Sequence, residues 1–246
     1  GEDGFYSKSF LEKERDSPWG ITQYDQKKGL ELTREDYIIV DEVCRIYYIP
    51  WFASPWDVPS VEFLEEFSPM CYKVASVIAY KEKVLDAIHA TGRPVIVSTG
   101  MTDIDKIDYL VEKFSDRDMV LMHCVGLYPC PNEHTHLEMI PYLYDRYGIP
   151  VGYSGHEEGI IPSIMAVCLG ACLIERHVTL SRDMYGSDQK ASLTVDQFDI
   201  LRKVVKGELF DLKCTMQLLD SNIRKFGPIA GEKEVLTRML GQANGD

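Results

Sequence analysis

Six short apolar segments recur along this chain at an even spacing, and they constrain its fold more than any other feature. The spacing is roughly 20 to 30 residues, which is typical of βα units in a parallel sheet. The apolar segments lie at 48–53, 71–75, 94–97, 119–125, 150–153 and 171–174. Most of the intervals have helical patterning, at 61–67, 82–90, 105–114 and 138–147. The sequence therefore predicts an α/β fold of consecutive parallel strands, with right-handed crossovers and the helices outside.

The segment 149–188 holds the clearest βα unit. Two of its apolar runs each end in a polar cluster with a histidine, His156 and His177. Between them, 160–170 is predicted to be a helix that Gly170 ends. The carboxyl ends of parallel strands meet at one edge of a sheet, so we expect the two imidazoles to lie close together. Neighbouring imidazoles beside carboxylates can bind a divalent transition metal, although two ligands do not identify the metal.

Each predicted strand ends in small polar or reactive side chains. These are Ser54, Ser76, Ser98, Tyr128, Ser154 and Glu175. Lys73 lies inside an apolar strand and must point into a pocket or toward the sheet margin. Polar groups at such strand ends form the active sites of α/β folds. A serine there is also often only a turn residue or a helix cap, and His123 is expected to be an interior histidine with its hydrogen bonds satisfied.

Composition limits the class of protein. The 246 residues are 45% hydrophobic and carry a formal net charge of -13, which predicts one large domain and argues against a nucleic-acid partner. The longest uncharged stretch, 159–174, is shorter than the ~18 to 20 residues of a membrane span. Seven cysteines, mostly within apolar runs, fit reduced thiols in a cytoplasmic protein better than disulfides. Residues 1–35 are expected to be irregular, and Thr33 is expected to cap a helix at 34–47.

Seven short motifs follow one another along the chain. They are Lys-Val-Ala-Ser at 73–76, Val-Ser-Thr-Gly-Met at 97–101, Tyr-Pro at 128–129, Gly-Tyr-Ser-Gly-His-Glu at 152–157, Glu-Arg-His at 175–177, Gly-Ser-Asp at 186–188 and Ala-Ser-Leu at 191–193. In this order they resemble the sialic acid synthase family, whose members make N-acetylneuraminate or a related nonulosonate. The resemblance extends over about residues 15–205.

The resemblance implies a (β/α)8 TIM barrel and a transferase reaction. Phosphoenolpyruvate would condense with an N-acylated amino sugar, such as N-acetylmannosamine or its 6-phosphate, and phosphate would be released. The implied cofactor is a divalent metal, Mn2+ or Mg2+, which activates the sugar aldehyde as a Lewis acid. By the motif match, His156 and His177 are its protein ligands.

The resemblance also assigns roles to the other strand-end residues. The positions that bind the carboxylate and phosphate of phosphoenolpyruvate are Lys73, Ser54, Ser76 and Ser98. Ser154 and Tyr128 match positions that line the site, and Glu175 and Asp188 match carboxylates that bind sugar hydroxyls or transfer protons. Tyr128, Glu175 and Asp188 are therefore the catalytic candidates.

The family pattern is covered only in part. Its first two strands, with Glu-x-Gly-x-Asn-His and Lys-x-Gln motifs, and its C-terminal antifreeze-like domain have no counterpart, so we expect an incomplete barrel over 1–226 and a linker at 227–246. The resemblance implies a homodimer for a complete member, and the open sheet edges predict poor solubility or association of this chain. Val77, Ile78 and Gly126 stand where many members have polar groups, and Gln189 stands where many have histidine.

Two alternatives to the synthase reaction follow from these features. One is a metal-assisted hydrolase on the same barrel, and the other is a non-catalytic relative retained for binding. A hydrolase would not need Lys73 and the serine hydroxyls, which favours the synthase. The residues at 77, 78 and 126 leave a non-catalytic relative as an alternative hypothesis.

Overall fold

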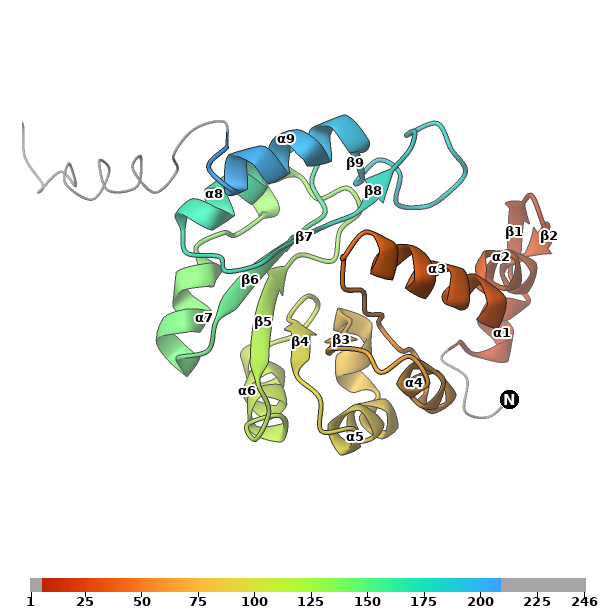
Figure 1. Ribbon diagram of the computed structural model, residues 1–246, viewed down its shortest axis with the longest axis horizontal. Helices are drawn as coiled ribbons and strands as arrows, with labels where there is room; N and C mark the ends of the chain where they lie inside the picture. Colours follow the sequence, from red (N-terminus) through yellow and green to blue (C-terminus); the bar gives the residue numbers. More distant parts are fainter. Residues whose placement is uncertain (1–5, 209–246) are drawn as a thin grey trace, which may run out of the picture. The chain divides into compact units, whose positions relative to one another are not determined.

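The structure, a computed structural model, describes residues 6–208. The chain forms two compact units, 1–198 and 199–246, and the sheet and the candidate site belong to the first. The centre of this unit is a five-stranded parallel sheet in the order β3-β4-β5-β6-β7, which is also the order in sequence (Figure 1). The strands are β3 (Tyr72–Val74), β4 (Val95–Ser98), β5 (Met119–Cys124), β6 (Val151–Gly155) and β7 (Ile174–Arg176). This sequential parallel order is that of a (β/α)8 barrel, of which the five strands form a part.

Helices alternate with the strands and cover one face of the sheet. They are α4 (Val58–Glu65), α5 (Glu82–Ala90), α6 (Ile104–Lys113), α7 (Met139–Tyr147) and α8 (Ile161–Cys168). Figure 1 shows α4 to α7 along the outer side of the strands. Shorter elements are η1 (Ser76–Tyr80), η2 (Asn132–His134) and the parallel pair β8 (Val178–Thr179) and β9 (Leu193–Thr194). Two further helices are α3 (Arg34–Ile46) and α9 (Val195–Val205).

The two faces of the sheet differ in chemistry because side chains alternate along a strand. The residues that face the helices are apolar and include Tyr72, Val74, Val95, Val97, Leu121, Val151 and Tyr153. Near the start of the strands, the other face carries a small apolar cluster of Cys71, Ile96 and Met122. Further along the same face the residues become polar. This change from apolar to polar along one face of the sheet places the site at the carboxyl ends of the strands.

Several predicted elements are confirmed. α5 has the predicted bounds, and α6 and α7 differ from theirs by one residue. Thr33 caps α3 through a capping box with Asp36, as its position predicted. Gly170 adopts a positive φ of 98° just after α8, which fits its predicted role in ending that helix.

The predicted strand at 48–53 is wrong, so the sheet has five strands among the described residues and not six. Tyr48 has a φ of 54°, and Pro50 has no backbone N–H to donate. The segment still lies beside β3, because the Lys73 N–H donates to the Ala53 carbonyl at 3.3 Å. The predicted strand at 171–174 forms three residues later, as β7.

The expectation that residues 1–35 are irregular is also wrong for the described part of this segment. It forms α1 (Lys8–Leu11), the antiparallel pair β1 (Glu14–Ser17) and β2 (Gly20–Thr22), and α2 (Gln23–Leu30). Thr22 caps α2 through a capping box with Asp25, a Thr-x-x-Asp signal that the sequence contains.

His123 is buried and its Nε2 lies 2.8 Å from the Thr135 carbonyl oxygen, which confirms an interior histidine. The cysteines between residues 6 and 208 are free, and Cys172 is exposed although it follows an apolar run. The predicted linker at 227–246 lies outside the described residues. Within 6–208, no helix is both long and apolar enough to cross a bilayer.

Candidate active site

All ten residues singled out from the sequence line one cavity of about 700 Å³. They are Ser54, Lys73, Ser76, Ser98, Tyr128, Ser154, His156, Glu175, His177 and Asp188. The cavity lies at the carboxyl ends of the strands, where α/β folds bind their ligands. The structure therefore brings the whole predicted set together, while the role of each residue stays a prediction.

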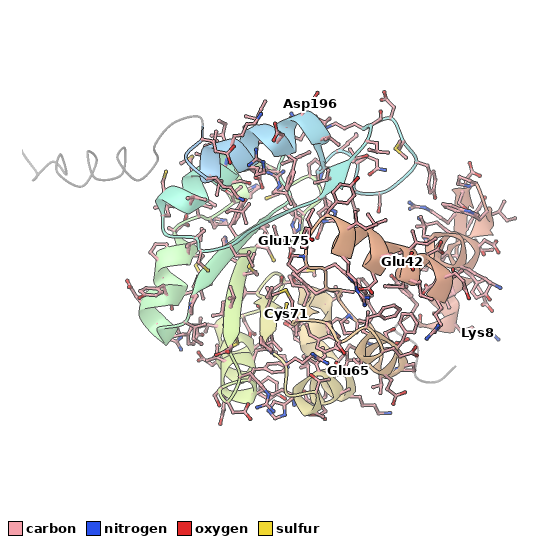
Figure 2. The ribbon with its side chains drawn as sticks, viewed as in Figure 1. Lys8, Glu42, Glu65, Cys71, Glu175 and Asp196 are labelled. Atoms are coloured by element: carbon pink, nitrogen blue, oxygen red, sulfur yellow. The ribbon has the colours of Figure 1, made fainter. Side chains whose placement is uncertain are left out.

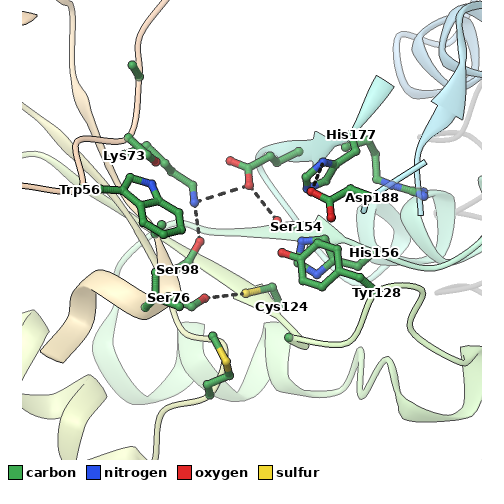
Figure 3. Close-up of a pocket in the computed structure, with 18 of the residues that line it drawn as sticks. Trp56, Lys73, Ser76, Ser98, Cys124, Tyr128, Ser154, His156, His177 and Asp188 are labelled. Carbon is green, nitrogen blue, oxygen red and sulfur yellow. Dashed lines mark hydrogen bonds and ion pairs between the residues drawn. The ribbon is translucent and has the colours of Figure 1, made fainter. Parts of the chain in front are cut away.

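Lys73 carries a positive charge on one side of the cavity. It is the middle residue of β3 and only 7% exposed. Its Nζ donates a hydrogen bond to Ser98 Oγ at 2.5 Å and lies 3.5 Å from Glu175 Oε1 (Figure 3). Ser154 Oγ donates to the same carboxylate oxygen at 2.8 Å. An ammonium has three donors, so beyond these contacts Lys73 can also hydrogen-bond to an anionic ligand.

Ser76 and Cys124 form the neighbouring wall. Ser76 Oγ lies 3.4 Å from Cys124 Sγ. Gly100 lies behind both, and an added Cβ there would be 2.8 Å from each of these two side-chain atoms. Only glycine permits this approach of the backbone. The wall therefore depends on the glycine in the Ser-Thr-Gly sequence after β4.

Three aromatic rings gather on the opposite side of the cavity. The Tyr128 ring lies 4.0 Å from the His156 ring and 5.6 Å from the His177 ring, between ring centroids. The two imidazole centroids are 5.6 Å apart. Figure 3 shows His156, His177 and Tyr128 on one side of the cavity and Lys73, Ser98 and Ser76 on the other. The predicted meeting of the two imidazoles is confirmed.

The orientation of His156 leaves one ring nitrogen available. His156 Nδ1 lies 2.7 Å from the Val125 carbonyl oxygen. A carbonyl oxygen only accepts, so Nδ1 carries the proton and, in the neutral ring, Nε2 keeps its lone pair. Burial lowers the pKa of His156, and the His177 ring lowers it further, whereas the Val125 carbonyl raises it. The neutral ring is thus favoured, which is the form that binds a metal.

Two further polar groups complete this side. His177 Nδ1 lies 3.8 Å from Asp188 Oδ2, and both side chains are partly exposed. Burial, followed by the nearby Cys124, Asp188 and Glu175, raises the pKa of Tyr128 to about 12. Tyr128 therefore keeps its phenolic proton at neutral pH and can donate a hydrogen bond.

The two imidazoles fit a loosely held divalent ion. Between residues 6 and 208, no group of three or more His, Cys, Asp or Glu side chains is placed to hold a metal. An ion bound by these two imidazoles would keep positions for water or substrate, as catalytic metals do. His156 Nε2 and the His177 ring are the groups that would hold it.

Sequence reasoning missed several residues of the cavity. Lys27 of α2, Trp56 and Met101 line it, and so does Cys124. Cys124 could have been found, because its register partner across the sheet is Ser154 and both point to the cavity. Lys27 is far from the other cavity residues in sequence, and no local pattern indicates its position.

Met101 and Gly126 are in contact. Met101 has a φ of 58°, and its side-chain atoms lie 2.9–3.5 Å from the place where a Cβ at position 126 would be. The thioether thus fills the space in which a side chain at 126 would begin. The glycine at position 126 therefore leaves the space that the Met101 side chain fills.

A buried ion pair joins the residues next to the two histidines in sequence. Arg176 Nη1 donates to Glu157 Oε1 at 2.8 Å, and neither side chain is exposed to solvent. Both residues are within the motifs that carry His156 and His177, but the sequence did not show that they pair.

Comparisons with known proteins show the family to which this chain belongs. Residues 3–208 match the NeuB family, and the chain belongs to this family of sialic acid and related nonulosonate synthases. The chain is 32% identical to an N-acetylneuraminate-9-phosphate synthase of Drosophila melanogaster, over 81% of this chain and 55% of that protein. It is 30% identical to an N,N'-diacetyllegionaminic acid synthase of Legionella pneumophila, over 79% of this chain and 56% of that protein.

A solved structure supports the same assignment. An N-acetylneuraminic acid synthetase of Leptospira borgpetersenii matches with a TM-score of 0.71 and 29% identity, over 88% of this chain and 74% of that one. The chain spans a little over half the length of the two relatives named above. The family match over residues 3–208 includes every residue of the candidate site.

Proposed function

We propose that this chain carries the catalytic site of a nonulosonate synthase, which condenses phosphoenolpyruvate with an N-acylated amino sugar and releases phosphate. The observation that carries the proposal is the pairing of two subsites in one cavity. Lys73 provides a buried cation on one side, and His156 and His177 provide two facing imidazoles on the other. The reaction joins an anionic substrate to an aldehyde, and each subsite suits one of these groups.

The Lys73 side suits phosphoenolpyruvate. The formal net charge of -13 would repel a trianionic ligand, so its binding needs a local cation. Lys73 supplies the charge, the hydroxyls of Ser76 and Ser98 lie on its side of the cavity, and Ser54 also lines the cavity. Hydrogen bonds from an ammonium to carboxylate or phosphate are among the stronger kinds in proteins.

The histidine side suits the sugar aldehyde. When bound, a divalent ion such as Mn2+ or Mg2+ would supply Lewis-acid activation of the carbonyl oxygen. His156 Nε2 and His177 would hold the ion, and the Val125 carbonyl fixes the tautomer of His156. Tyr128, whose ring lies 4.0 Å from that of His156, has a protonated hydroxyl that can hydrogen-bond to the sugar.

The proposed reaction forms a carbon–carbon bond and breaks a carbon–oxygen bond to phosphate. The methylene carbon of phosphoenolpyruvate attacks the aldehyde carbon, a C–C bond forms, and the aldehyde oxygen takes a proton to become a hydroxyl. Water adds to the carbon that bears phosphate and loses one proton. The hydroxyl that this leaves collapses to the ketone as the bond from that carbon to the phosphate oxygen breaks, and the phosphate takes the second proton. Among residues 6–208, the carboxylates that line the cavity are Glu175 and Asp188. Either can transfer these protons.

A non-catalytic relative that binds the same ligands is the second candidate. Val77 lines the cavity, and Met101 fills the space beside Gly126, so two positions of the wall are apolar. Such a protein would bind phosphoenolpyruvate without turning it over. A metal-assisted hydrolase has less support, because it leaves the buried Lys73 without a role.

The proposal is tested by three measurements on the wild-type chain. Calorimetry measures phosphoenolpyruvate binding, and a phosphate assay measures release with N-acetylmannosamine, before and after chelation. Binding with sugar-dependent and metal-dependent phosphate release would support the synthase. Binding without release would show that this chain binds phosphoenolpyruvate but does not complete the reaction by itself, and no binding of phosphoenolpyruvate would contradict both candidates.

A further inference from the structure

The ion pair between Arg176 and Glu157 lies next to both candidate metal ligands in sequence. Glu157 follows His156, and Arg176 precedes His177. Side chains alternate along a strand, so Arg176 points away from the cavity side on which Glu175 and His177 lie. Arg176 is among the residues that line the cavity, but both side chains of the pair are completely buried, so a substrate does not reach the guanidinium or the carboxylate.

Arg176 connects three segments of the chain. Its Nη1 donates to Glu157 Oε1 at 2.8 Å, to the Gly159 carbonyl at 2.7 Å and to Ser163 Oγ at 3.0 Å. Its Nη2 donates to the Glu157 carbonyl at 2.5 Å and to the Ala191 carbonyl at 3.4 Å. The first four acceptors belong to the segment after His156, and Ala191 belongs to the segment after Asp188.

Glu157 is held equally firmly. Tyr153 donates its hydroxyl to Glu157 Oε2 at 2.8 Å, and Ser163 Oγ donates to Glu157 Oε1 at 3.2 Å. Both carboxylate oxygens therefore have partners, as a buried charge requires. The segment that carries Ala191 is also tied to β7, because the Leu193 N–H donates to the His177 carbonyl at 2.8 Å.

We propose that Arg176, through its pair with Glu157, is the positioning residue that sets the distance and angle between the His156 and His177 rings. The planar guanidinium has five donors in a fixed fork. It can therefore hydrogen-bond at once to the segment after His156 and to the segment after Asp188, which a lysine ammonium cannot. Arg176 acts through the backbone of the two histidines and does not touch the substrate. The inference deepens the proposed function, because it rests on these imidazoles as the metal ligands.

A purely structural role is the competing explanation. A buried ion pair whose partner is removed usually destabilises the fold, and an unstable fold would lower any activity. The test therefore needs a readout other than stability, and a control arginine with the same kind of contacts elsewhere. Arg93 is such a control, because it donates to both oxygens of Glu65 and to the Pro69 carbonyl. Figure 2 shows Glu65 well away from Glu175.

The experiment measures Mn2+ binding directly by calorimetry on the 246-residue chain without substrate. The variants are Arg176→Lys, which keeps the charge, and Glu157→Gln with Arg176→Met, which removes both charges together. The control is Arg93→Lys, and thermal unfolding is recorded for every variant. We expect the Kd for Mn2+ to rise about 10- to 100-fold in both Arg176 variants, as for other residues that orient metal ligands. Phosphoenolpyruvate binding at Lys73 should not change, and Arg93→Lys should lower the Tm without changing the Kd for Mn2+.

Three results would overturn the inference. If the folded Arg176→Lys chain binds Mn2+ as tightly as the wild type, Arg176 does not position the ligands, and the proposed function still stands. If Arg93→Lys weakens Mn2+ binding in proportion to its loss of Tm, the effect is one of stability alone. If the wild-type chain binds no Mn2+, the metal site of the proposed function fails and the inference fails with it.

Discussion

Lys73 Nζ and Glu175 Oε1 lie 3.5 Å apart although their strands, β3 and β7, are at opposite edges of the five-stranded sheet. Neighbouring strands are about 4.8 Å apart, so four spacings would separate the edges of a flat sheet by about 19 Å. The sheet must therefore curl until the two inward side chains meet across its concave face. The contact between Lys73 and Glu175 is thus a consequence of the barrel curvature, and it joins the two edges of the sheet inside the cavity.

Removal of the Lys73 charge should weaken phosphoenolpyruvate binding more than it affects folding. Lys73→Ala removes a charge-assisted hydrogen bond of about 1.5 to 3 kcal/mol, so we expect the Kd to rise about 10- to 150-fold. Calorimetry with Lys83→Ala as a control checks this, because Lys83 is exposed on α5 and lines none of the cavity. An equal Kd for Lys73→Ala and the wild type would show that the anion binds elsewhere.

Replacement of the Glu175 carboxylate by an amide should have different effects on phosphoenolpyruvate binding and on kcat. Glu175→Gln removes the negative charge near Lys73, so phosphoenolpyruvate, itself an anion, should bind as tightly or more tightly. If Glu175 transfers a proton, kcat should fall by about 100-fold or more. Asp188→Asn, beside His177, should instead weaken sugar binding. Steady-state kinetics of both variants checks this, and a rise in the KM for phosphoenolpyruvate in Glu175→Gln would contradict the prediction.

Each histidine should be necessary for the metal. His156→Ala or His177→Ala leaves a single imidazole, so Mn2+ binding and any metal-dependent phosphate release should be lost at every tolerable metal concentration. His89→Ala is the matched control, because His89 is on α5 with Asp116 as its partner and is not part of the cavity. Full Mn2+ affinity in both histidine variants would remove this metal site from the mechanism.

The cavity could be predicted from the sequence to the extent that its residues follow local rules. The alternation along a strand and the parallel order of the strands place Lys73, Ser98 and Ser154 on one face, and both can be inferred without coordinates. Glu157 and Arg176 are local to the histidine motifs, yet their pairing depends on how β6 and β7 pack against α8. Packing of distant segments is not encoded in any one stretch of sequence.

The failed predictions of secondary structure have local causes instead. The run at 48–53 has the composition of a strand, but the left-handed Tyr48 and the proline at 50 break its hydrogen bonding. Trp56 reaches the cavity from the loop after this run. Lys27 does so from α2, which the sequence pattern did not predict to be a helix because only its Thr22 cap indicated one.

Gly100→Ala should disturb the wall of Ser76 and Cys124. The new methyl group would lie 2.8 Å from both side-chain atoms, and we expect a loss of about 1 to 3 kcal/mol in the free energy of unfolding. Chemical denaturation measures this loss. Cys124→Ala removes one of the two clashes, so the double variant should lose less than the sum of the single variants. Additive losses would mean that Cys124 does not crowd position 100.

Stability should fall at alkaline pH because several tyrosines are held in the protonated form by the fold. Burial and hydrogen bonding to Asp108 raise the pKa of Tyr147 to about 12, whereas an unfolded tyrosine titrates near pH 10. A raised pKa in the folded state contributes stability that is fully present below the unfolded value and is lost as the pH rises through the folded value. The free energy of unfolding should therefore decline as the pH rises from about 10 toward about 12.

Urea unfolding between these two pH values tests the prediction, with Tyr147→Phe as the informative variant. A phenylalanine does not titrate, so the decline of the free energy of unfolding with pH should be shallower in Tyr147→Phe than in the wild type. Tyr142→Phe is the matched control, because Tyr142 is an exposed tyrosine on the same helix. The Tyr147→Phe chain should also lose some stability at neutral pH, since Asp108 loses a hydrogen-bond donor. An identical decline in Tyr147→Phe and the wild type would show that Tyr147 ionises as readily in the folded chain as in the unfolded one.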